Sequence, residues 1–220
     1  MRTLISTLLV VCFTATVFAD APSRVHKYAG YSSLGAYEPV RPKSLNDIPE
    51  PVRTKLVAHL KKRLGESFYS SLQLCGGQIV DFAEFRRRES DWKDYKWEVF
   101  AYNLHFEFHL PDKGIEFYQA SIRLRADGSV IEDIDLPDIL RHPERAVFVP
   151  LSSAMQAATT AGFDVSHCEI EIAYRPKDDR CVYSFQQLVR RDGPSLYFKC
   201  IDIDAHTGKQ LRVFKQEGIK

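Results

Sequence analysis

The sequence lacks the motifs that identify the commonest enzyme classes. Its 220 residues contain no P-loop, no glycine fingerprint of a dinucleotide site and no serine in a nucleophile elbow. Cys181 and Cys200 have no glycine-rich loop beside them that could serve as an oxyanion hole, which argues against a cysteine nucleophile. The sequence therefore predicts a protein that is not an enzyme and that uses no cofactor.

An excess of either charge is also missing. The chain has 30 Lys and Arg against 29 Asp and Glu, and removing residues 1–19 takes away Arg2 and no acid, which leaves 29 of each. A net charge near zero argues against a general nucleic-acid partner, because the phosphate backbone selects a basic surface. We therefore expect a protein or peptide partner and no nucleic acid.

Long apolar runs are absent after the first residues. Arg2 precedes an apolar run over residues 4–18, and the small-residue pattern Val-Phe-Ala at residues 17–19 is typical of a signal-peptide cleavage site. The run is short for a membrane span, so we expect a cleaved signal peptide at residues 1–19 rather than an anchor. This predicts a secreted or periplasmic protein without an integral membrane segment after cleavage.

The cysteines leave two alternatives open. Four remain after cleavage, and none belongs to a C-x-x-C pair of the kind that binds zinc: Cys75, Cys168, Cys181 and Cys200. An exported protein can form disulfides, and four cysteines permit three complete pairings, among which the sequence does not choose. Buried free thiols are the alternative.

Composition and periodicity divide the rest of the chain into four parts. Residues 20–46 carry scattered tyrosines among glycine, serine, proline and basic residues, which is typical of an extended, exposed arm. The arm can pack loosely on the domain or dock a partner through its tyrosines. We expect an N-terminal α+β module over residues 47–136, a linker over residues 137–150 and a second module over residues 151–220.

A helix is expected at the start of the N-terminal module. Asp47 is an N-cap signal, with Glu50 three residues later, and apolar side chains then recur at helical spacing: Val52, Leu56, Val57, Leu60 and Leu64. Gly65 can end this helix, and a short second helix is expected over residues 66–74. Residues 78–85 predict a strand, and the arginines at positions 86–88 predict a charged loop.

Residues 95–110 predict a long strand. The even-numbered residues from Phe100 to Leu110 are apolar and share one face, and turns at residues 111–114 and 127–128 lead to further strands. The opposite face carries His105, Glu107 and His109, which are residue types that bind Zn²⁺. His105 and His109 would nevertheless lie about 13 Å apart on a regular strand, so a polar sheet face is the favoured interpretation and a metal site the weaker one.

The C-terminal module shows a similar plan. An alanine-rich helix is expected over residues 151–163, with Ser152 as its N-cap and Gly162 as its stop. Strands over residues 168–174 and 181–189 precede a closing hairpin, whose turn lies at residues 204–208. The exposed rims of a binding surface are expected at residues 163–165, 176–179 and 191–194.

The end of the chain, residues 152–214, resembles a PepSY domain. The specific part is Ile-Asp-Ala-His-Thr-Gly-Lys at residues 203–209, and the looser part is a set of small and aromatic residues before it: Ala154, Ala157, Gly162, Tyr183, Phe185 and Tyr197. Residues 47–136 resemble the same plan distantly, with Arg-Ala-Asp-Gly at residues 125–128, so the two halves match as a duplicated module. The resemblance implies a cystatin-like fold and non-catalytic roles: inhibiting or chaperoning peptidases, or regulation at the cell envelope. It carries no catalytic residues.

The sequence therefore predicts an α+β protein of two helix-on-antiparallel-sheet modules, PepSY-like or cystatin-like, in tandem after a signal peptide. We expect an exported binding protein, with an extended peptide joining an edge strand as the physical mechanism. The alternative is an envelope metal-binding protein or metalloenzyme that uses the face formed by His105, Glu107 and His109.

Overall fold

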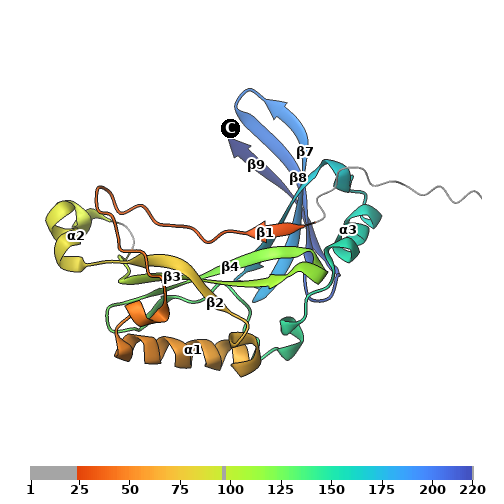
Figure 1. Cartoon of the computed structure of the whole chain (residues 1–220). Helices are drawn as coiled ribbons and strands as arrows, with labels where there is room; N and C mark the ends of the chain where they lie inside the picture. The colour runs from red at the N-terminus through yellow and green to blue at the C-terminus, as the bar shows by residue number, and fades with distance from the viewer. Residues whose placement is uncertain (1–23, 96–97, 220) are drawn as a thin grey trace, which may run out of the picture.

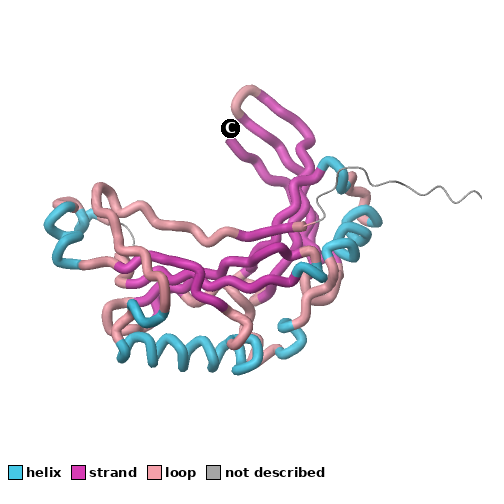
Figure 2. Tube along the Cα trace, in the orientation of Figure 1, coloured by secondary structure: helices cyan, strands magenta, loops and turns pink. Residues whose placement is uncertain are grey.

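The computed structural model describes residues 24–95 and 98–219, and these residues form an α+β fold with two sheets. One sheet lies along the long helix α1 (Glu50–Tyr69), and the other stands beside α3 (Leu151–Thr160) at the opposite end of the fold (Figure 1). The strands dominate the centre of the molecule, and the helices lie on its outside (Figure 2). The expected signal peptide at residues 1–19 lies outside the described residues.

The first sheet is mixed, with strand order β1-β4-β3-β2 and with β5 paired to β4. Its strands are β1 (Val25–Lys27), β2 (Gln73–Ile79), β3 (Tyr102–Leu110), β4 (Ile115–Leu124) and β5 (Val130–Glu132). β1 runs parallel to β4, and the other pairs are antiparallel. The predicted apolar face of β3 is confirmed, because Tyr102, Leu104, Phe106 and Phe108 are buried in the core.

The second sheet is antiparallel throughout, with strand order β6-β7-β8-β9. Its strands are β6 (Cys168–Arg175), β7 (Arg180–Asp192), β8 (Ser195–Asp204) and β9 (Gln210–Ile219). Ile201 and Ile203 of β8 are fully buried, and Asp202 and Asp204, which alternate with them, are buried as well. Gly208 adopts a φ of 71° in the turn before β9, a conformation that glycine reaches without steric cost.

The expected helix in the N-terminal half is α1, which begins at Glu50. Asp47 belongs to a preceding 3₁₀ turn, where it closes a capping box with Ser44. Val52, Leu56, Leu60 and Leu64 are buried against the first sheet, as their spacing predicts. Gly65 breaks the helical geometry with a φ of 75°, so the last turn of α1 continues at an angle. Short 3₁₀ turns occur at Leu45–Asp47, Trp92–Asp94, Pro111–Lys113, Pro143–Ala146 and Val165–His167.

The strand predicted over residues 78–85 is wrong from Val80 onward. The strand ends at Ile79, and a helix, α2 (Phe82–Arg88), follows it. Asp81 caps this helix, because its carboxylate accepts hydrogen bonds from the backbone N–H groups of Ala83 and Glu84. The three arginines therefore form the last turn of α2 rather than a loop, where positive charge is favourable next to the helix dipole.

Buried side chains of the two halves form one continuous hydrophobic core. The ring of Tyr118 on β4 stacks on Phe108 with 5.1 Å between centroids, and its hydroxyl lies 4.0 Å from Sγ of Cys181 on β7. The expected linker also contributes to this core through Ile139 and Phe148. The two helix-on-sheet units therefore share one core, and residues between them fill the space at their junction.

The arm is extended, as expected, but its described part is not loosely packed. β1 adds to the edge of the first sheet, and Val25, Ala29, Leu34 and Tyr37 are buried. Leu34 and Tyr37 form a second hydrophobic cluster with Val80, Phe85 and Phe100 on the face of the sheet opposite α1. The arm therefore covers the polar face of β3.

Candidate functional site

The structure does not bring His105, Glu107 and His109 together as one site. His105 is buried, whereas the His109 side chain is 53% exposed and its Nε2 lies 3.5 Å from Oε1 of Glu107. No group of three or more His, Cys, Asp or Glu side chains in residues 24–95 and 98–219 is arranged to hold a metal ion. We therefore base no function on this face.

His105 lies beneath the arm, between the sheet and Tyr31. The two rings meet edge to face with 4.7 Å between their centroids, and His105 is only 1% exposed. Burial lowers the pKa of His105, although Asp135 and the Gly30 carbonyl oppose this effect. Among the described residues, neither Nε2 of His105 nor Oδ1 of Asn103 has a hydrogen-bond partner.

None of the four cysteines in the described part of the chain forms a disulfide. Cys168, Cys181 and Cys200 are buried, and Cys75 is exposed. Burial raises the pKa of Cys181 to about 12 and that of Cys168 to about 11, so both remain protonated at neutral pH. The free-thiol alternative is the one that the structure supports.

Asp202, Asp204 and His206 of the closing hairpin stabilise the fold. Asp202 accepts hydrogen bonds from Arg175 and Arg212, which hold its pKa below the ordinary value although burial acts in the opposite direction. The Asp204 carboxylate accepts the backbone N–H of His206 in the turn. His206 Nε2 accepts the backbone N–H of Cys181, so its Nδ1–H donates to the carbonyl of Val147.

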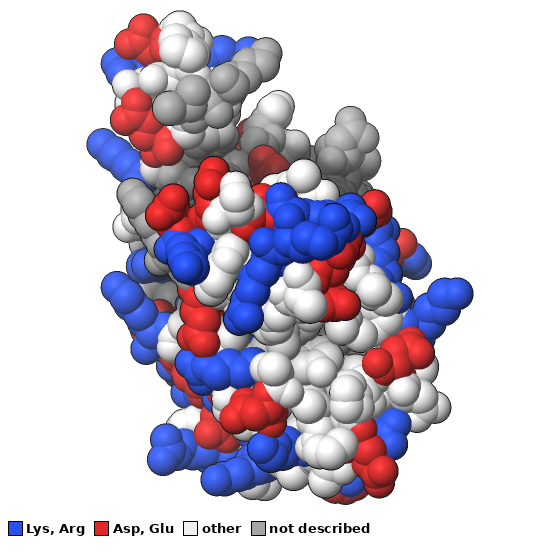
Figure 3. All heavy atoms as spheres, turned by 90° about the vertical axis from the view of Figure 1, so that its left-hand side faces the viewer, with Lys and Arg blue, Asp and Glu red and all other residues white. Residues whose placement is uncertain are grey.

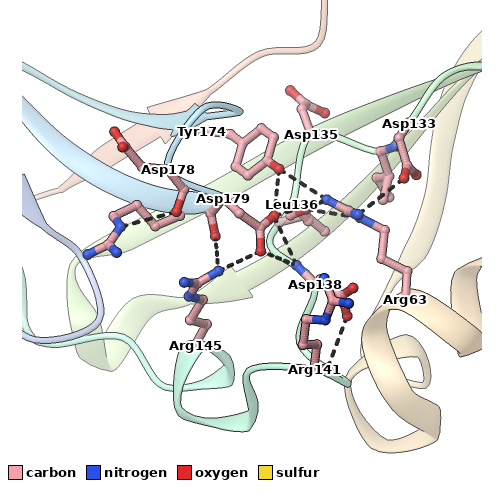
Figure 4. A network of polar contacts seen from close by, with 12 residues as sticks. Arg63, Asp133, Asp135, Leu136, Asp138, Arg141, Arg145, Tyr174, Asp178 and Asp179 are labelled. Atoms are coloured by element: carbon pink, nitrogen blue, oxygen red, sulfur yellow. Dashed lines mark hydrogen bonds and ion pairs between the residues drawn. The ribbon is translucent and has the colours of Figure 1, made fainter.

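A network of polar contacts joins the two halves of the molecule around Asp179 (Figure 4). Its carboxylate accepts hydrogen bonds from Arg63 of α1 at 3.2 Å, from Arg145 at 2.5 Å and from the Tyr174 hydroxyl at 2.8 Å. The backbone N–H of Asp138 donates to the same carboxylate. Asp179 is therefore an internal contact, whereas residues 176–178 of the same turn are exposed, as the predicted rim requires.

The other two expected rims differ from each other. Phe163 and Val165 are buried in the core, so residues 163–165 offer only Asp164 to a partner. The turn at residues 191–194 is fully exposed at the tip of the β7–β8 hairpin. We call this tip and the strand ends beside it, residues 188–199 and 213–219, the distal ribbon.

The distal ribbon extends away from α1 and from the first sheet (Figure 1). β9 forms its outer strand and, among the described strands, pairs with β8 alone. Seven of the nine residues from Gln210 to Gly218 are exposed, and Phe214 and Gly218 are half-buried. Leu211 and Val213 are 39% and 46% exposed. A strand with one unpaired edge presents backbone donors and acceptors to which another chain can bind. This edge is the candidate binding site.

The side chains around this edge were not identifiable from the sequence. The β8–β9 register places Lys199 directly opposite Lys215, and a β-bulge between Asp202 and Ile203 sets that register. Counting back from the Ile203–Gln210 pair without the bulge would place Phe214 opposite Lys199 instead.

Charge of either sign is intermixed over the side of the molecule shown in Figure 3, where Lys and Arg side chains alternate with Asp and Glu. No helix within the described residues is both long enough and apolar enough to cross a membrane. Comparisons with protein-family models, with curated proteins and with solved structures find no match to this chain. The site must therefore be interpreted from its own geometry.

Proposed function

We propose that this chain is an exported, non-catalytic binding protein that captures an extended segment of a protein or peptide partner on the free edge of β9. The added strand hydrogen-bonds to the unpaired backbone groups of β9 and extends the second sheet by one strand. The observation that carries the proposal is the exposed edge of this ten-residue strand.

Two features of the edge favour a partner strand. The distal ribbon projects from the rest of the described fold, and β9 is an outer strand of its sheet (Figure 1). Leu211 and Val213 also leave apolar surface at the edge, and natural proteins usually protect such edges from other chains. The edge is therefore long and carries apolar side chains beside charged ones, which is consistent with binding another strand.

The resemblance to PepSY domains supplies the biological role in this proposal. It supports inhibition of a peptidase, or regulation at the cell envelope, as the consequence of capturing the partner. The proposed signal peptide at residues 1–19 puts the encounter in the secreted or periplasmic compartment. The same proposal includes the descent of both halves from a PepSY-like module. The core that the two halves share would then have formed after the duplication.

The test combines peptidase assays with a proline pair in β9. Mature protein from residue 20 is incubated with peptidases of the exporting cell's envelope, and binding and cleavage rates are measured. Val213→Pro and Phe214→Pro are compared, because successive residues of an antiparallel strand direct their N–H groups to opposite sides. The variant that removes a bond to β8 loses stability, and the other stays folded and removes a donor from the free edge.

We expect the wild type to bind and slow at least one peptidase and the folded proline variant to do so more weakly. Thermal unfolding identifies which of the two variants is folded. If the wild type neither binds nor slows any envelope peptidase, the inhibitory role is wrong. If the folded proline variant binds as tightly as the wild type, the edge of β9 is not the binding site.

A further inference from the structure

The β8–β9 pair contains two like charges directly opposite each other, Lys199 and Lys215. Opposed residues of an antiparallel pair point to the same face, with Cβ atoms about 4.5–5.5 Å apart, and like charges in this arrangement repel. Nζ of Lys199 lies 4.2 Å from the ring centroid of Phe163 and donates to the Gly162 carbonyl at 3.4 Å. Within the described part of the chain, neither lysine has a carboxylate as an ion-pair partner.

The same face continues as a groove of about 560 Å³, lined among others by Val189, Arg190, Tyr197, Lys199, Lys215 and Glu217. The Arg190 guanidinium lies over the Tyr197 ring at 4.4 Å, and its Nη2 lies 3.7 Å from the carboxylate of Asp192. Glu217 stands opposite Tyr197 in the register, two pairs away from the lysines and next to them on the same face. The cationic side chains on this face therefore outnumber the acids that can neutralise them.

The opposite face of β9 has a different chemistry. Arg212 lies on this face, but its charge is paired with Asp202, to which it donates a hydrogen bond at 2.8 Å. The Arg212 guanidinium also covers the ring of Phe214, at 4.6 Å from its centroid. Leu188 and Phe198 continue this face toward the tip of the ribbon, opposite each other in the register. The apolar surface of this face comes from Phe214, Leu188 and Phe198, and Gln216 of β9 lies beside them.

We propose that the segment captured on β9 is an extended strand that alternates acidic and apolar residues. Side chains alternate between the two faces of a strand, so every second residue of an added strand stands on the lysine side and the others stand beside Phe214. Carboxylates on the lysine side neutralise the Lys199–Lys215 pair, and apolar side chains cover Phe214. This assignment rests on the proposed capture of an extended segment at the same edge.

The test uses three fluorescein-labelled octapeptides that alternate valine with glutamate, with glutamine or with lysine. Their affinities for the mature protein are measured by fluorescence anisotropy at low ionic strength and again in high salt. Lys215→Glu is the test variant, and Lys62→Glu, an exposed position on α1, is the matched control. Sedimentation equilibrium of the unlabelled protein reports whether copies associate with one another.

We expect the glutamate peptide to bind most tightly, with salt weakening its binding. Lys215→Glu should weaken it by about five- to thirtyfold, since one cross-strand attraction becomes a repulsion, and Lys62→Glu should leave it unchanged. Equal binding of all three peptides, or no effect of Lys215→Glu, overturns the acidic assignment and leaves edge capture standing. Failure of every peptide to bind overturns both proposals. One further result overturns the acidic assignment: a dimer that becomes stronger in Lys215→Glu and that the peptides do not displace. A second copy of the chain then occupies the edge.

Discussion

Replacing Asp179 by Asn tests whether the polar network at the junction holds the two halves together. The substitution preserves the shape of the side chain and removes its charge. Asp179 also adopts a φ of 49°, a left-handed conformation that Asn tolerates as well as Asp does. Any loss of stability therefore reports the interactions of the carboxylate and not backbone strain.

The magnitude follows from the partners of the carboxylate. Arg63 and Arg145 are 17% and 13% exposed, so both guanidinium groups have lost most of their water. Arg145 depends on the negative charge of Asp179, whereas Arg63 also pairs with Asp133 at 3.2 Å. Breaking a fully buried ion pair costs about 3–5 kcal/mol. Asp179 itself is 29% exposed and Asn retains one acceptor, which reduces the expected loss to about 2–3 kcal/mol.

The assay is urea-induced unfolding, with the neighbouring exposed residue as the matched control. Asp178→Asn removes the same charge from the same turn, but its carboxylate has no partner from the other half among the described residues. We expect Asp178→Asn to change the free energy of unfolding by less than about 0.5 kcal/mol. If the two variants unfold at the same urea concentration, the network does not stabilise the junction.

Three further predictions concern burial and pH. The pKa of His105 is lower in the folded protein than its ordinary value of 6.5, so the unfolded chain takes up the proton first on acidification. The free energy of unfolding should therefore fall between about pH 7.5 and about pH 5.5, and it should fall less in His105→Gln; equal slopes would contradict this. Leu60→Ala should cost about 2–5 kcal/mol in urea unfolding, because Leu60 is fully buried, and a cost below about 1 kcal/mol would show that its site collapses. Gly128→Ala should lower stability by about 1–2 kcal/mol, since φ is +83° and the new Cβ would lie 3.3 Å from Cα of Val52; an unchanged melting temperature would refute the reasoning.

The parts of the fold that the sequence predicts well are those with a long, regular period. The stripe from Val52 to Leu64 and the alternation along β3 each bury one face, so pattern and structure agree. The helix α2 was missed although its capping signal is present in Asp81 and Glu84. The apolar pair Phe82 and Phe85 fits either a short strand or a helix turn, and tertiary packing decides between them.

The junction and the arm depend on contacts between residues far apart in the sequence. Asp179 contacts Arg63, which is 116 positions away in the sequence, and His105 contacts Tyr31 of the arm. No local sequence pattern predicts either contact. The candidate site was predicted only as a general edge strand. The lysine pair depends on a β-bulge, which shifts the register by one residue without a signal that we recognised in the sequence.

Backbone hydrogen exchange of β9 in the presence of the glutamate–valine peptide tests the central claim most directly. An added strand covers the free edge, so amides of Gln210–Ile219 should exchange more slowly at saturating peptide. β2, an outer strand of the first sheet, should be unaffected. Saturable binding that leaves β9 exchange unchanged, or that protects β2 instead, would contradict the account.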